Sequence, residues 1–327
     1  MKSPIFTFFL IALCSCTTNE KELPKVEPDL VTIQLISESN QVYLGRSSTL
    51  LVLALTDRNV STRNVTIRIT QSDISPKGAL ILSSGGFGNS FYGIGFQTNT
   101  TLDFALSNGL QVFEIKWEGP YGWGTANEGI GYTLALRGYT EIVKWLKINR
   151  VQNTDKIICH GGSGGSMQIA YGLTNFDLDE FIDYGILVAG PPSSDLERAI
   201  FGEQEDIALW PDGIGGFGIT DYIMGWRNNG NYCTNRAVNP PSFVLDRLRD
   251  ESLVQDKPEN KYNYSLMHLY FVNTDDITHA DQQGLLYFNS ITSAKSWIYL
   301  PNETSHDVAG IEAGALAIRS LLHQILN

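Results

Sequence analysis

A single serine lies in the middle of a glycine cluster, where a strand-like run meets a helix-like one. Residues 161–165 are Gly-Gly-Ser-Gly-Gly; the apolar run 156–159 comes before them and the amphipathic segment 166–173 after them. In a strand-to-helix turn of the pattern G-x-S-x-G, the serine has strained backbone angles and an exposed hydroxyl. The residues two positions away must be small, and here both are glycine. Ser163 is therefore a candidate nucleophile.

A phosphate-binding loop is the alternative interpretation of these glycines. A P-loop requires G-x-x-x-x-G-K-[ST], and a dinucleotide-binding loop requires G-x-G-x-x-G, but Met167 stands where the third glycine should be. The dinucleotide pattern does occur at Gly213, Gly215 and Gly218, inside an irregular segment with no strand before it. We expect a flexible loop there, and we predict no cofactor.

A serine hydroxyl needs a base to take its proton, and the base needs an acid to orient it. In strand–turn–helix architectures of this kind the chain order is serine, acid, histidine, each after a later strand. The acid then follows the strand that begins at Ser265. It is Asp276, with Asp275 as the alternative, which could instead cap the turn. The base is His306, between the last strand and the final helix, with His279 as the alternative.

A second glycine-rich loop comes two strands before the serine turn. Residues 83–88 are Ser-Ser-Gly-Gly-Phe-Gly and directly follow an apolar strand. This is where backbone N–H groups that stabilise an oxyanion should lie, and one such donor is worth about 2.7–4 kcal/mol in the transition state. A plain glycine turn is the alternative. The His-Gly-Gly run 160–162 does not compete, because no second serine turn follows it.

The elements that must position these residues alternate between strands and helices. Three β-rich runs begin at Val31, Thr49 and Asn64, and we expect them to extend one edge of the sheet in antiparallel fashion. From Ala79 onward, strands alternate with helices, which implies right-handed crossovers and a mostly parallel sheet. Residues 193–264 interrupt this alternation and are expected to form a helical, loop-rich cap. Further strands are expected to begin at Ala79, Gln111, Lys156, Phe181, Ser265 and Lys295, and helices to cover 132–148, 166–173 and 310–326.

With these motifs the chain resembles the α/β-hydrolase superfamily over residues 31–327. The resemblance rests on GGSGG, SGGFG, VNTDD and ETSHD before a terminal helix. It implies an α/β fold with a mostly parallel central sheet flanked by helices and a cap insert between strands 6 and 7. The first loop lacks the histidine of the HGG type, so lipase subfamilies that carry it are not supported. The implied site consists of a triad, Ser163, Asp276 and His306, and an oxyanion hole formed by the N–H groups of Gly164 and of Gly86 or Phe87.

The amino-terminal segment indicates export. An apolar stretch at 5–13 follows a single lysine; it is too short to span a bilayer, which needs about 20 apolar residues, but it suits a secretory signal. The run Leu-Cys-Ser-Cys that follows resembles a bacterial lipobox. It predicts a signal peptide over 1–15 and a lipid anchor on Cys16, with an ordinary cleaved signal peptide as the alternative. Residues 16–30 are polar with two prolines and are expected to be a tether.

Composition narrows the possible partners. The 327 residues are 43% hydrophobic and 18% charged, as in globular proteins, and the net charge of −12 argues against a nucleic-acid partner. No Cys or His spacing typical of a metal site occurs. Cys159 belongs to the apolar run before the serine turn and should be buried. Whether it pairs with Cys233 stays open.

These features predict an exported serine hydrolase that cleaves a carboxylic ester of a small molecule and needs neither metal nor organic cofactor. A serine peptidase of the same fold and a non-catalytic binding protein that keeps the fold are the alternatives. The aromatic residues that could line an apolar substrate pocket are Trp123, Trp210, Tyr222 and Trp226, although those in the insert could equally form its own small core.

Overall fold

The strands form one mixed sheet in the computed structural model, which describes residues 31–125, 128–151, 156–202, 216–235, 238–254, 262–264, 267–274, 278–301 and 305–327. Within these residues the strand order is β1-β2-β3-β5-β4-β6-β7-β8-β9. The pairs β1–β2, β2–β3 and β3–β5 are antiparallel, and all other neighbours are parallel. The expected parallel sheet with an antiparallel edge is confirmed. The strands are β1 (Val31–Tyr43), β2 (Arg46–Asp57), β3 (Val60–Thr70), β4 (Gly78–Ser83), β5 (Leu110–Trp117), β6 (Ile157–Gly162), β7 (Tyr184–Val188), β8 (His268–Asn273) and β9 (Lys295–Tyr299).

Helices connect the parallel strands, and the sequence predicted most but not all of them. The expected helices at 132–148, 166–173 and 310–326 correspond to α2 (Gly131–Asn149), α3 (Gly164–Asn175) and α8 (Glu312–Leu326). Two helices were not expected, α1 (Phe96–Ser107) and α7 (Thr278–Ser290). Their first halves are rich in threonine, asparagine or aspartate, which have low helix propensity, so these segments carry little helical signal.

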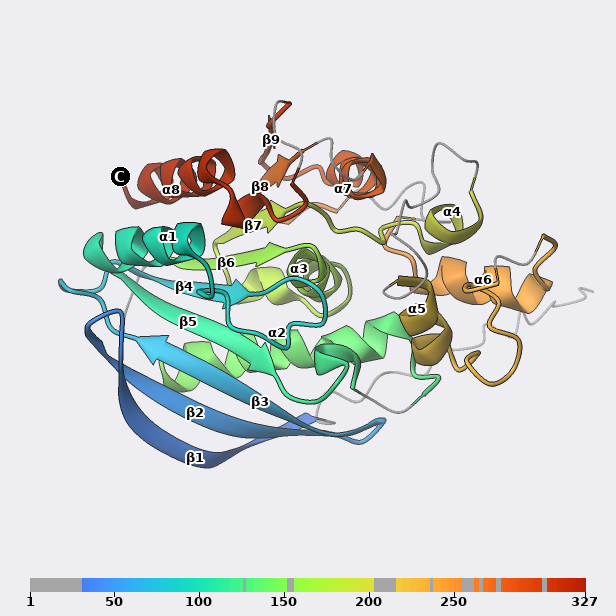
Figure 1. The fold of residues 1–327 in the computed structure, drawn as a ribbon, viewed down its shortest axis with the longest axis horizontal. Coiled ribbons are helices and arrows are strands. Elements are labelled where there is room, and N and C mark those ends of the chain that lie inside the picture. Colours follow the sequence, from blue (N-terminus) through green and yellow to red (C-terminus); the bar gives the residue numbers. More distant parts are fainter. Residues whose placement is uncertain are drawn as a thin grey trace, which may run out of the picture. The chain divides into compact units, whose positions relative to one another are not determined.

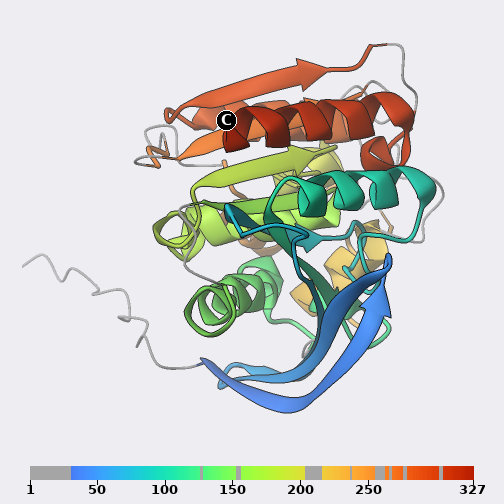
Figure 2. The same ribbon diagram turned by 90° about the vertical axis from the view of Figure 1, so that its left-hand side faces the viewer.

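The central strands are buried on both faces, as parallel strands in layered α/β proteins are. Successive residues on β4 enter different clusters: Ile81 belongs to a core shared with α2 and α3, whereas Leu80 belongs to a core shared with α1 and α8. Phe113 and Val112 on β5 divide in the same way. Figures 1 and 2 show the two helix pairs on opposite faces of the sheet. The sheet is therefore fixed from both sides, and its carboxyl edge is a rigid platform for loops.

The segment between β7 and β8 supplies the helices that lie beyond this carboxyl edge. They are α4 (Leu196–Phe201), α5 (Gly216–Met224) and α6 (Ser242–Glu251), and Figure 1 shows them past the arrowheads of the central strands. The insert was expected between strands 6 and 7; in this nine-stranded sheet it lies between the seventh and eighth strands, β7 and β8. The expectation of a flexible loop at the Gly213, Gly215 and Gly218 pattern is wrong for its last part, because Gly218 is helical in α5; residues 213–215 lie outside the described residues.

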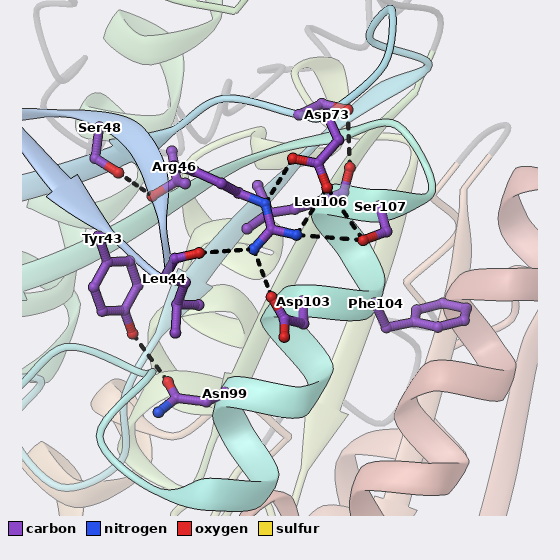
Figure 3. A network of polar contacts seen from close by, with 12 residues as sticks. Tyr43, Leu44, Arg46, Ser48, Asp73, Asn99, Asp103, Phe104, Leu106 and Ser107 are labelled. Carbon is purple, nitrogen blue, oxygen red and sulfur yellow. Dashed lines mark hydrogen bonds and ion pairs between the residues drawn. The ribbon is translucent and has the colours of Figure 1, made fainter.

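A surface network ties the β1–β2 hairpin to α1 (Figure 3). The Arg46 guanidinium donates to both carboxylate oxygens of Asp73, at 2.7 and 2.8 Å, and to Asp103 of α1 at 2.5 Å. One turn away, the Tyr43 hydroxyl shares its one proton between the Asn99 Oδ1 of α1, at 3.0 Å, and the Gly93 carbonyl, at 2.8 Å. Exposed ion pairs contribute only about 0–1 kcal/mol each, so the network serves more to place the hairpin than to stabilise it.

Both described cysteines are buried and free, so Cys159 and Cys233 do not pair. Cys159 is fully buried on β6, as its place in the apolar run predicted. Burial raises the pKa of the Cys159 thiol to about 12, and the Tyr139 hydroxyl partly opposes that shift.

The predicted signal peptide, tether and Cys16 anchor lie in residues 1–30, outside the described residues, and stay predictions. In the part of the chain that the structure describes, none of the helices is both long and apolar enough to span a membrane.

Candidate active site

Ser163 forms the turn between β6 and α3, and its backbone is strained. Its φ of 49° and ψ of −115° lie outside the regions that L residues ordinarily populate. Hydrogen bonds hold it from both sides: the Ser163 N–H donates to the Val188 carbonyl of β7 at 2.8 Å, and the Ser163 carbonyl accepts from the Met167 N–H at 3.1 Å. The side chain is half-buried. This is the geometry that the G-x-S-x-G pattern predicted.

The glycines of the turn make room for backbone. A Cβ on Gly161 would collide with the Gly165 backbone, and a Cβ on Gly165 would lie 2.5 Å from the Ser83 carbonyl oxygen at the end of β4. A Cβ on Gly164 would collide with the Gly86 carbonyl. Strand β6, helix α3 and the loop after β4 can therefore approach one another only because these positions lack side chains.

The loop after β4 passes directly beside the serine turn. A Cβ on Gly85 would lie 3.6 Å from the Ser163 Cβ. Trp123, in the 3-10 turn η1 (Gly122–Gly124), holds this loop: its indole Nε1–H donates to the Gly86 carbonyl at 3.1 Å, and its backbone N–H donates to the Phe87 carbonyl at 3.0 Å. The Gly86 carbonyl and the Phe87 N–H belong to one peptide unit and point in opposite directions. The indole therefore fixes the direction of the Phe87 N–H, a role that the sequence did not indicate.

His306 lies in the loop between β9 and the 3-10 turn η4 (Val308–Gly310) and is half-buried. The Leu300 N–H donates to the Asn273 carbonyl at 2.9 Å, so the end of β9 is paired with the end of β8. The two loops predicted to carry the base and the acid thus start side by side. Asp276 and its alternative Asp275 lie outside the described residues, as does the side chain of His279.

A cavity of about 150 Å³ opens beside Ser163, and we call it the apolar cavity. It reaches from the turn, where Gly86 and Gly164 line it, to the helices of the insert. None of the described side chains that line it carries a charge. Its other lining residues include Phe87, Trp123, Met167, Leu196, Ala199, Ile200, Phe217 and Ile219.

A second cavity, of about 390 Å³, also reaches Ser163 and Gly86, and we call it the polar cleft. It lies between the loop that precedes α1 and the loop that precedes α8. His306 and Asp307 line it, and neither lines the apolar cavity. The two cavities therefore meet at Ser163 and differ in chemistry. The cleft's other lining residues include Ser84, Ser90, Phe91, Tyr92, Ile94, Thr98 and Val308.

Another histidine, His160, is close to the turn in sequence but has a structural role. It is fully buried on β6; its Nδ1 lies 3.0 Å from the Ile186 carbonyl and its Nε2 lies 2.9 Å from the Tyr92 hydroxyl. Because a carbonyl only accepts, Nδ1 carries the proton and Nε2 accepts from Tyr92. Burial lowers the pKa of His160 to about 4, so it is neutral at physiological pH.

Of the aromatic residues that were expected to line a substrate pocket or form a core in the insert, some line the apolar cavity and others pack elsewhere. Trp123 lines the apolar cavity, whereas Trp226 is buried and packs edge-on against Tyr232, with ring centroids 5.8 Å apart. Tyr222 packs against Tyr121 at 5.2 Å. Trp210 lies outside the described residues. Among the described side chains, no group of three or more His, Cys, Asp or Glu could hold a metal ion.

Comparisons place this geometry among known structures. No protein-family model matches the sequence, and no curated protein does. Acetyl xylan esterase 1 from Thermoanaerobacterium sp. JW/SL YS485 aligns with a TM-score of 0.54 and 14% identity over 89% of this chain and 87% of its own. The Francisella virulence factor BioJ aligns at 0.51 and 14% over 84% of each chain. A Pyrococcus horikoshii acylaminoacyl peptidase aligns at 0.53 and 14% over 88% of this chain and 48% of its own. At such identities the likeness establishes the fold alone.

Proposed function

We propose that this chain, which has the α/β-hydrolase fold, hydrolyses a carboxylic ester of a small molecule with Ser163 as the nucleophile. The observation that carries the proposal is a strained Ser163 at the junction of two cavities, one of which His306 also lines. Backbone strain of this kind is maintained by surrounding structure and is concentrated at functional sites.

In the proposed reaction His306 takes the proton from the Ser163 hydroxyl, which attacks the ester carbonyl, while Asp276 orients the imidazole. The oxyanion that forms accepts hydrogen bonds from the Gly164 N–H and from the loop after β4, through Phe87 or Gly86. Gly164 is the first residue of α3, so its N–H has no acceptor within the helix, and the helix dipole favours negative charge there.

The protonated His306 then gives its proton to the leaving alcohol, and a serine-bound acyl group remains. Water that His306 activates attacks this acyl group and releases the acid, which restores the serine.

The chemistry of the apolar cavity favours an ester over a peptide as substrate. A peptide terminus carries a charge that has to be paired when it is buried. The described side chains that line the apolar cavity offer no such partner. One structural neighbour is an esterase and another a peptidase, so both chemistries occur on this fold.

Labelling with a fluorophosphonate, which reacts with activated serines, tests the proposal. We expect the folded full-length protein to be labelled and Ser163→Ala and His306→Ala to lose the label. Two matched variants serve as controls: Ser320→Ala removes an exposed hydroxyl of α8, and His323→Ala removes an exposed histidine of the same helix. Both should label like wild type.

Turnover of p-nitrophenyl butyrate, with and without these substitutions, completes the test. A folded wild type that is neither labelled nor turns over this ester would refute the proposal. Labelling that persists in Ser163→Ala would place the nucleophile elsewhere.

A further inference from the structure

The position of His306 gives the two cavities different roles, provided that the proposed ester hydrolysis is correct. The group that protonates the leaving oxygen must lie within hydrogen-bonding reach of it, about 2.6–3.2 Å. His306 lines the polar cleft and not the apolar cavity. The leaving alcohol therefore has to occupy the cleft, and the acyl chain extends into the apolar cavity on the other side of the carbonyl.

We propose that the substrate is an ester in which a short apolar acyl chain is joined to a hydroxyl-rich alcohol, such as a sugar or another polyol. The apolar cavity accepts the acyl chain and sets its length. The polar cleft accepts the alcohol and sets its chemistry.

The size of the apolar cavity limits the acyl chain. Its volume is about 150 Å³, and helices α4 and α5 of the insert contribute Leu196, Ile200, Phe217 and Ile219 to its walls. A cavity of about 150 Å³ with walls of Leu, Ile and Phe stays dry and admits benzene, a ligand of six carbons. Acyl chains of about four to six carbons should therefore fill the cavity, and much longer chains should not fit.

The polar cleft has the two kinds of surface that a sugar requires. Asp307 places an exposed carboxylate in the lining, and Ser90 a half-buried hydroxyl. The Asp307 Oδ1 accepts from the Gly310 N–H at 3.1 Å, and a carboxylate has further acceptor capacity for hydroxyl groups. Phe91 and the exposed Ile94 give apolar surface for the C–H face of a ring. A carboxylate in the lining also disfavours an anionic alcohol.

The part of the cleft wall formed by Phe91 and Tyr92 is held in place by a buried ion pair. Arg68 donates to both oxygens of Glu114, at 2.6 and 2.9 Å, and its guanidinium lies 4.3 Å from the centroid of the Phe91 ring. Glu114 in turn accepts from the Gly93 N–H at 2.8 Å. A buried pair with its hydrogen bonds satisfied gives a wall of fixed shape, so the cleft is preformed for its ligand.

The acyl assignment is tested with p-nitrophenyl esters of two to ten carbons and the full-length enzyme. We expect kcat/KM to peak at four to six carbons. Ile200→Trp, which fills the apolar cavity, should lower kcat/KM for the butyrate by about tenfold or more and spare the acetate. Ile148→Trp, at an exposed position of α2, is the matched control and should change neither. If Ile200→Trp changed the preference among leaving alcohols but left the preference for acyl chain length as in wild type, the apolar cavity would hold the alcohol. The acyl assignment would then be wrong.

The leaving-group assignment is tested with butyrate esters of methanol, glucose and glycolate. We expect kcat/KM to be highest for the glucose ester and lowest for the anionic glycolate ester. Asp307→Asn keeps an acceptor for the Gly310 N–H, and it should raise the glycolate-to-methanol ratio by about fivefold or more. Because the same variant is measured on both esters, a general loss of activity through the neighbouring His306 cancels in this ratio.

Two outcomes separate this inference from the proposed function. A folded enzyme that turns over none of the esters would refute both. An enzyme that is active on p-nitrophenyl butyrate but treats glucose and methyl butyrates alike, or prefers the glycolate ester, would overturn only the inference about the alcohol.

Discussion

The tryptophan that holds the loop after β4 offers the sharpest test of the site. Replacing Trp123 by Phe removes the indole N–H and leaves the Gly86 carbonyl without its donor, while the backbone bond from residue 123 to Phe87 remains. Gly86 is exposed, so the loss amounts to the net worth of one hydrogen bond, about 0.5–1.5 kcal/mol. Rotation of the Gly86–Phe87 peptide relieves this cost and at the same time moves the Phe87 N–H.

The size of the effect follows from two limits. If the freed peptide misplaces the proposed oxyanion donor for part of the time, the transition state loses about 0.5–1.5 kcal/mol, or about 2- to 13-fold in kcat. Complete loss of one donor sets the upper limit, at about 2.7–4 kcal/mol. We therefore expect kcat of Trp123→Phe to fall by about 2- to 13-fold.

The assay must separate this effect from enlargement of the apolar cavity, which Trp123 also lines. A misplaced oxyanion donor lowers kcat by the same factor for acetate and hexanoate p-nitrophenyl esters, whereas a larger cavity changes their ratio. Trp297→Phe, the same substitution on β9, is the control and should leave kcat unchanged. Equal kcat in wild type and a folded Trp123→Phe would refute the reasoning.

Three further predictions concern the surroundings of the site. Because the pKa of His160 falls to about 4 on folding, protonation favours unfolding, so stability should drop from pH 6.5 towards 4 by about 3 kcal/mol. In denaturant titrations of His160→Gln, the free energy of unfolding should depend less on pH between 6.5 and 4 than in wild type. The same pH dependence in both proteins would refute this. Gly165→Ala should lower stability by about 1–3 kcal/mol or more and abolish activity, because its Cβ meets backbone. Gly218→Ala in α5 is the control: the added Cβ would have no neighbour closer than 4.0 Å, so the free energy of unfolding should stay unchanged or rise in the same denaturant titrations. In peptide mapping, Cys159 and Cys233 should resist iodoacetamide until the protein is denatured; labelling in the native state would contradict their burial.

Much of the fold was predictable because its signals are local. The nine strand runs are short apolar or alternating segments between turn residues, and each is a strand in the structure. The serine turn was predictable for the same reason, since the strand, the small residues and the helix are contiguous around Ser163. The helix α1 was missed because its first half is rich in residues of low helix propensity. It forms through tertiary packing of Leu102 and Leu106 against β5 and α8.

The parts of the site that could not be predicted depend on contacts between distant segments. Trp123 reaches Gly86 across 37 residues, and nothing around Trp123 in the sequence marks it as a partner of that loop. The two cavities are also invisible in the sequence, because each is lined by residues from several elements. Pattern analysis identifies a residue type in a local setting; the shape of a cavity is a property of the packed whole.

The antiparallel β1–β2 hairpin at the sheet edge also supports the polar cleft. The Tyr43 hydroxyl at the end of β1 donates to the Gly93 carbonyl at 2.8 Å, and its ring lies under the Arg68 guanidinium, 3.3 Å from the centroid. Burial, with Glu114 adding to it, raises the pKa of Tyr43 to about 12, so the hydroxyl keeps its proton and stays a donor. Gly93 is thus held through its N–H by Glu114 and through its carbonyl by Tyr43. Because Gly93 adjoins Tyr92 and Ile94 of the polar cleft, the hairpin fixes the cleft wall from behind. The edge strands therefore act as a support for the alcohol side of the proposed site.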